Sequence, residues 1–106
     1  MKSSLRKMEW AYHVTLREFL PSIAKKGLQP DSHESANGEE VIFVERSQEE
    51  AEVYAAPDTV TLRFLVDGFG CTEDGEDVLY DVTIPAVEIE VYDKKARSWR
   101  PLKERR

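Results

Sequence analysis

The sequence predicts an α+β domain with a mostly antiparallel β-sheet core and two short helices. Four segments alternate apolar and polar residues with the period of a β-strand. Two segments before residue 57 instead place apolar residues at helical spacing. The helices lie near the front of the chain and most strands follow them, which is typical of an α+β fold rather than of alternating βαβ units.

The length of 106 residues is sufficient for one hydrophobic core, so we expect residues 1–106 to form a single domain. No segment approaches the ~20 apolar residues of a membrane-spanning helix, and the first ten residues lack the apolar region of a signal peptide. We therefore expect a cytoplasmic protein with no membrane contact. Cys71 is the one cysteine, which excludes an internal disulfide, and no cysteine–histidine spacing predicts a metal site.

The net charge of −6 is unevenly distributed. Residues 93–106 carry seven basic and two acidic side chains, so the rest of the chain is strongly acidic. An acidic body disfavours broad contact with a phosphate backbone. The basic C-terminal tail, residues 94–106, is either a solvated end or a local contact for an anionic partner.

The first strand is expected over residues 10–16, with bulky apolar side chains on one face and His13 and Thr15 on the other. A short helix follows, with apolar residues at helical spacing from Leu16 to Ala24. Pro21 fits its first turn, and Gly27 is a suitable C-terminal cap. Residues 31–40 are polar and are expected to form an exposed loop.

A second strand is expected over residues 41–45, followed by a second helix to about Ala56. Ser47 and Glu50 form an S-x-x-E capping box that marks the start of this helix. Its expected buried stripe contains Ala51, Tyr54 and Ala55.

Further strands are expected over residues 60–66, 78–84 and 87–91, with a short last strand around Trp99. Residues 68–77, GFGCTEDGED, read as a glycine-rich acidic loop. Asp81 would then lie inside the fourth strand, on the face opposite Tyr80.

Three segments resemble the ADP-ribosyltransferase superfamily, in particular small bacterial and phage members of the branch that includes diphtheria toxin and the poly(ADP-ribose) polymerases. YHVT at 12–15 resembles the H-x-[ST] strand that binds NAD in the family. VIFVERSQEEAEVYA at 41–55 is similar to the family's strand and following helix. EDVLYDV at 76–82 resembles the E-x-x-x-Y-D strand that starts with the catalytic glutamate.

The resemblance implies an NAD-dependent transfer of ADP-ribose to a macromolecule, without a metal. Glu76 would be the catalytic carboxylate, stabilising positive charge on the nicotinamide ribose. His13 and Thr15 would hold NAD, and Tyr54 would stack on the nicotinamide. Ile42 would be the fourth NAD-binding residue, at one wall of the nicotinamide pocket. It stands where the family has its first stacking tyrosine, which is a departure from the pattern.

Each of these residues also has a purely structural interpretation. Glu76 is one of four acids in a polar loop, and Asp81 is the alternative catalytic acid. His13 alone on a strand is more often a structural residue, and Tyr54 is equally compatible with a core position.

Three alternative functions follow from the same residues. The first is a degenerate member of the fold that binds NAD, ADP-ribose or another nucleotide without chemistry, which Ile42 favours. The second is an RNA 2′-phosphotransferase, which requires more basic residues in the cleft than residues 8–92 offer. The third is an interaction module that binds a protein through its acidic surface. The macromolecular acceptor, a protein or a nucleic acid, is not specified by the sequence.

Overall fold

The computed structural model describes residues 8–30 and 40–103. It is a compact α+β fold with few short helices, as the sequence predicts, but its antiparallel strands form two sheets instead of the one expected. The larger sheet has the order β1(Glu9–Leu16), β3(Thr59–Val66), β6(Glu90–Asp93), β7(Ser98–Pro101). The smaller sheet has the order β2(Val41–Phe43), β5(Asp77–Tyr80), β4(Gly70–Cys71).

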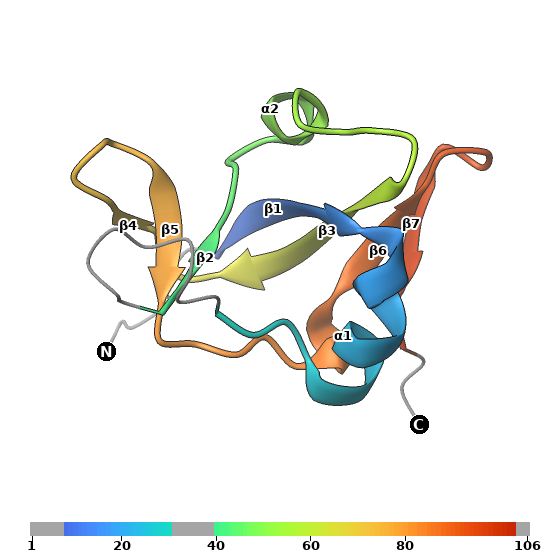
Figure 1. Cartoon of the computed structure of the whole chain (residues 1–106), viewed down its shortest axis with the longest axis horizontal. Helices are drawn as coiled ribbons and strands as arrows, with labels where there is room; N and C mark the ends of the chain where they lie inside the picture. The colour runs from blue at the N-terminus through green and yellow to red at the C-terminus, as the bar shows by residue number, and fades with distance from the viewer. Residues whose placement is uncertain (1–7, 31–39, 104–106) are drawn as a thin grey trace, which may run out of the picture.

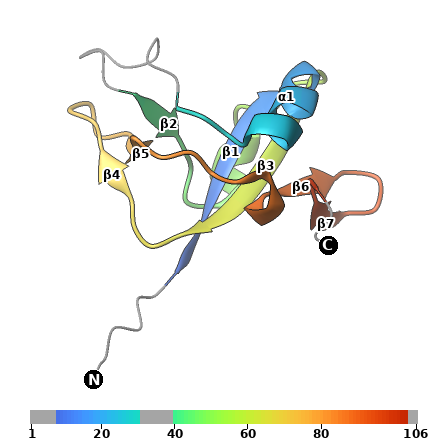
Figure 2. The ribbon, with the colours of Figure 1, turned by 90° about the horizontal axis from the view of Figure 1, so that it is seen from below.

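The two sheets lie side by side, and the helices lie on opposite sides of the β1–β3 pair (Figures 1 and 2). The 3₁₀ helix η1(Arg17–Phe19) and helix α1(Leu20–Lys26) follow β1 directly. Helix α2(Gln48–Glu52) connects the end of β2 to β3, and the 3₁₀ helix η3(Ala86–Glu88) precedes β6.

Strand β3 forms the centre of the core. Val60, Leu62, Phe64 and Val66 alternate along it and are all buried, which confirms the predicted strand. It pairs with β1 over eight residues and with β6 over only two, Leu62 with Val91 and Arg63 with Glu90. Beyond these two pairs, the start of β3 and the end of β6 are not paired with each other.

The core side of β1 is the face that carries Ala11 and His13, not the face with the bulky apolar side chains. Ala11 is fully buried and lies on the same face as His13, since side chains alternate along a strand. Trp10 on the bulky face is only half-buried, and it is covered by the guanidinium of Arg63, 4.1 Å from the ring centroid. The small side chain of Ala11 allows close packing of the sheet, whereas the large rings lie at the protein surface.

Local signals at the two helices are confirmed, but α2 is shorter than expected. Gly27 caps α1 with φ +84°, and its N–H donates to the carbonyl oxygen of Ile23. Ser47 Oγ accepts the N–H of Glu50 at 3.1 Å, which is the predicted cap of α2. The helix ends at Glu52, before the expected boundary at Ala56.

The C-terminal half contains three corrections. Strand β5 ends at Tyr80, so the predicted strand over 78–84 is wrong beyond that residue. Residues 86–88 form η3 instead of a strand, and β6 starts at Glu90. Part of the glycine-rich segment forms β4, which pairs with β5.

Strand β7 contains Trp99, as predicted, and lies within the basic segment 94–106. Most of the polar loop expected at 31–40 lies outside the described residues.

Candidate functional site

A cavity of about 430 Å³ lies where β1, the end of β2, the segment after α2 and the start of β5 meet. This volume is within the usual range for small-molecule sites. Four of the five predicted site residues line it: His13, Thr15, Tyr54 and Glu76. The other lining residues are Val14, Leu16, Phe43, Glu45 and Thr59.

His13 joins two strands at this cavity. Its Nδ1 atom lies 2.7 Å from the carbonyl oxygen of Phe43, and a carbonyl can only accept, so Nδ1 carries the hydrogen. Burial lowers the pKa of the imidazole, and the hydrogen bond to Phe43 opposes part of this effect. The ring is therefore neutral at pH 7, and Nε2 is left as a hydrogen-bond acceptor.

Glu45 is a second carboxylate at the cavity, and it was not among the predicted site residues. Its backbone N–H donates to the carbonyl oxygen of Tyr12, which holds this segment against β1. Burial raises the pKa of Glu45, and the negative charges of Glu50, Asp77 and Glu76 raise it further. Its position in the sequence, an acidic residue directly after the apolar residues of β2, could have marked Glu45 as a candidate site residue.

Glu76 lies at the rim of the cavity, in the β4–β5 hairpin. Its N–H donates to Thr72 Oγ1 at 3.0 Å, and its carbonyl oxygen accepts the N–H of Thr72 at 2.9 Å. Gly75 has φ +86°, which closes the turn between them. The backbone of Glu76 is thus held in place, while its side chain is exposed to solvent.

Tyr54 is not a core residue, so its expected place in the buried stripe of the second helix is wrong. It is 64% exposed, whereas Ala51 on the preceding helix is fully buried. Because α2 ends at Glu52, the chain no longer follows helical spacing at Tyr54, and its ring lies at the cavity instead of under the helix.

Ile42 does not line this cavity. It is 2% exposed and belongs to the hydrophobic core. Phe43, one residue along β2, faces the cavity in its place. Alternation along β2 could have identified both Phe43 and Glu45, because they share one face of the extended segment.

A second cavity of about 470 Å³ adjoins the first along β1. The two share His13, Thr15 and Phe43 among their lining residues. Helix α1, Gly27 and Gln29 close the second cavity, and Ile42 contributes to its wall. His13 therefore lies at the junction of two adjoining cavities.

Asp81 was predicted inside a strand, and this is wrong. It follows the end of β5 with φ +46°, and its N–H donates to the carbonyl oxygen of Glu40. It does not line the cavity. The left-handed backbone, which aspartate tolerates better than most residues, directly follows the end of the strand at Tyr80, four residues before the expected end at residue 84.

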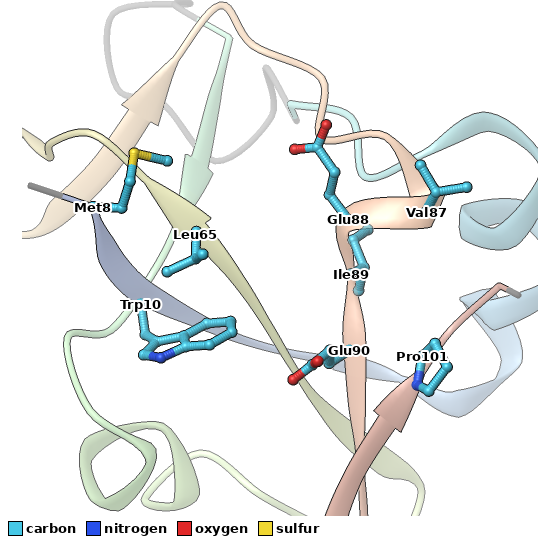
Figure 3. Close-up of a pocket in the computed structure, with 8 residues that line it drawn as sticks. All are labelled: Met8, Trp10, Leu65, Val87, Glu88, Ile89, Glu90 and Pro101. Carbon is cyan, nitrogen blue, oxygen red and sulfur yellow. The ribbon is translucent and has the colours of Figure 1, made fainter. Parts of the chain in front are cut away.

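A larger cavity of about 720 Å³ lies on another part of the surface (Figure 3). Side chains of β1 and β3 line one side of it, and those of η3, β6 and β7 the other. Its wall is largely apolar, with Met8, Trp10 and Leu65 on the first side. Glu90, which lines this cavity, forms an ion pair with Arg63, whose Nε lies 2.7 Å from the carboxylate. Glu88 is its other polar side chain, and none of the predicted site residues lines this cavity.

No group of three or more histidine, cysteine, aspartate or glutamate residues suited to a metal ion occurs among residues 8–30 and 40–103. In the same residues, no helix is long and apolar enough to span a membrane. Comparisons with protein-family models, curated proteins and solved structures found no match.

Proposed function

We propose that this chain is an ADP-ribosyltransferase-like protein that binds NAD in the His13 cavity and transfers ADP-ribose to a macromolecule. One observation carries the proposal. His13 and Thr15, Tyr54, and Glu76 come from the three segments that resemble the family, are far apart in the sequence, and line one cavity. A chance resemblance of three short motifs gives no reason for them to meet.

The cavity has the electrostatic character that this reaction needs. The bond between the nicotinamide nitrogen and C1′ of the ribose breaks, the nicotinamide leaves with the electron pair, and positive charge develops on the ribose. A nucleophile of the acceptor then bonds to C1′ and loses its proton. Glu76 and Glu45 give the cavity a negative potential, which favours the cationic nicotinamide ring and the developing charge on the ribose.

Each of the two adjoining cavities would bind one end of the dinucleotide. In this proposal the nicotinamide ribose lies near Glu76, with Tyr54 and Phe43 as aromatic neighbours of the nicotinamide ring. The adenosine end extends past His13 toward α1, and Nε2 of His13 accepts a hydrogen bond from a ribose hydroxyl. Glu76 is the catalytic residue of this arrangement, and His13 and Thr15 are binding residues.

A second candidate is a binding module that holds NAD or ADP-ribose without cleaving NAD. The burial of Ile42, at the position of the family's first stacking tyrosine, favours it. In this alternative Phe43 supplies only a partial wall for the nicotinamide, and the leaving group is not held in a reactive orientation.

Calorimetric titration of the chain with NAD and with ADP-ribose, followed by measurement of nicotinamide release, tests the proposal. An enzyme binds NAD and releases nicotinamide in a time-dependent manner. A binding module binds both ligands and releases none. Failure to bind either ligand contradicts both candidates and favours an interaction module.

A further inference from the structure

A third cavity of about 340 Å³ lies between the start of β3 and the β6–β7 hairpin. It arises because the β3–β6 ladder contains only two residue pairs, so Thr59–Thr61 and Tyr92–Asp93 continue without pairing to each other. Figure 1 shows the tip of the β6–β7 hairpin at the same end of the sheet as the start of β3. The residues that line the cavity come from this end of the sheet.

Four basic side chains line this cavity: Arg17, Lys94, Lys95 and Arg100. Asp93 is the one acidic side chain among the described lining residues, which leaves a net charge of +3 in a chain of net charge −6. Asp93 Oδ1 already accepts the backbone N–H groups of Lys95 and Ala96, and Oδ2 lies 4.0 Å from Arg100. Arg17, Lys94 and Lys95 form no ion pair within residues 8–30 and 40–103.

An aromatic ring lies among these cations. Tyr92 lines the cavity and is half-buried, and its ring centroid lies 5.2 Å from that of Trp99. The packing against Trp99 restricts the orientation of the tyrosine ring. Cations that contact phosphates, combined with an aromatic ring on which a base stacks, are typical of sites for single-stranded nucleic acids. A phosphopeptide would use the cations but not the ring.

We propose that this cavity binds single-stranded nucleic acid, with phosphates on the four basic side chains and one base on Tyr92. The cavity shares Thr59 with the His13 cavity, and Arg17 directly follows Leu16 of that cavity. A strand held here therefore passes beside the proposed NAD site. Its role as the acceptor of ADP-ribose rests on the proposed function, whereas binding of the strand does not.

The site is local, because most of the chain is acidic and repels a phosphate backbone elsewhere. Four cations neutralise at most four phosphates, so the logarithm of the binding constant should fall with the logarithm of salt concentration at a slope no steeper than about −3. A basic surface that covered the molecule would give a steeper slope.

The test is fluorescence anisotropy of a labelled 12-nucleotide single-stranded oligonucleotide, titrated with the full chain in the absence of NAD. Lys94→Gln combined with Lys95→Gln should weaken binding by about 10-fold or more. The backbone N–H of Lys95 still bonds to Asp93 after this change, so the turn is retained. Lys25→Gln combined with Lys26→Gln is the matched control, since this adjacent pair at the end of α1 does not line the cavity.

Tyr92→Leu tests the stacking of a base and should also weaken binding of the oligonucleotide. The affinity for a peptide with the same number of phosphates should not change in this variant.

Binding that is lost equally in both lysine pairs, or absent in the unchanged chain, would overturn the proposal. Equal affinity for inorganic phosphate or for the phosphopeptide would overturn the nucleic-acid assignment. Calorimetry with NAD on the same variants separates this inference from the proposed function. A chain that binds the oligonucleotide but not NAD refutes the proposed function alone, and one that cleaves NAD but does not bind the oligonucleotide refutes the inference alone.

Discussion

The imidazole Nδ1 of His13 donates a hydrogen bond of 2.7 Å to the carbonyl oxygen of Phe43, and this bond joins the larger sheet to the smaller one across 30 residues of sequence. Both residues also line the cavity proposed to bind NAD. The same side chain therefore contributes to the stability of the fold and to the shape of the site.

His13→Ala should lower the free energy of unfolding by about 1–3 kcal/mol, because the carbonyl of Phe43 loses its partner in a part-buried position. It should also weaken NAD binding by about 1–2 kcal/mol through loss of the Nε2 contact. Denaturant unfolding and calorimetry measure the two effects separately. His13→Asn retains a donor near the position of Nδ1 and should recover much of the stability but not the affinity. Recovery of both would show that His13 does not contact the ligand.

The pH dependence of stability has a defined sign at His13. The pKa of His13 is lowered in the folded state, so the unfolded chain binds more protons as the pH falls below the ordinary histidine value of about 6.5. The contribution of neutral His13 is fully present above that pH and is lost as the pH falls toward the lower folded pKa. The raised pKa of Glu45 acts in the opposite direction, since protonation of this carboxyl favours the folded state.

Comparison of the unchanged chain with His13→Asn isolates the histidine, because His33 and Glu45 are common to both. Chemical unfolding at pH 7.5 and 5.5 should show a larger loss of stability in the unchanged chain. A parallel loss in the two proteins would contradict the assignment.

Glu76→Gln should lower nicotinamide release by about 10²-fold or more with little change in NAD affinity, because the carboxylate acts on charge that develops in the transition state. Saturating NAD and a nicotinamide assay provide the measurement. Glu73→Gln is the matched control, since Glu73 lies in the same exposed hairpin but does not line the cavity. Equal rates for Glu76→Gln and the unchanged chain would remove Glu76 from the mechanism.

Gly27→Ala should destabilise the protein by about 2–3 kcal/mol. A Cβ atom at this position would lie 2.6 Å from the carbonyl oxygen of Ile84, and φ is +84°. Thermal unfolding of two further variants separates these causes. Gly75→Ala has a similar φ of +86° with open space around it and should cost about 1 kcal/mol, and Gly68→Ala meets no atom within 4 Å and should cost less. Equal costs for Gly27 and Gly75 would show that the contact with Ile84 is relieved by a small shift.

Arg63→Met should cost about 1–2 kcal/mol of unfolding free energy. The guanidinium lies between Trp10 and Trp99, 4.1 and 4.4 Å from their ring centroids, and Nε bonds to Glu90. Arg46→Met is the matched comparison, because Arg46 also stacks on a ring, that of Phe69, and pairs with Asp77, but its side chain is 53% exposed. Its loss should cost less than about 1 kcal/mol. A larger effect at Arg46 would contradict the role assigned to burial.

The features that the sequence determined by itself are those decided by neighbouring residues. Ser47 caps α2 and Gly27 ends α1 because capping depends on a side chain or a backbone angle within one turn. The alternation along β3 likewise predicted its buried apolar residues, because one face of this strand forms the core. These interactions need no knowledge of which distant segments meet.

Tertiary structure decided the rest. Phe43 and Glu45 face the cavity, and Ile42 does not, because the pairing of β2 with β5 and of Tyr12 with Glu45 selects which face of the segment turns inward. Asp81 ends β5 through a positive φ, with its N–H on Glu40, a contact that no local pattern indicates. The cavity beside Tyr92 exists because β3 and β6 pair over only two residues. Period and capping are local properties of a chain, whereas the face that a strand buries and the point at which two strands separate depend on their partners in space.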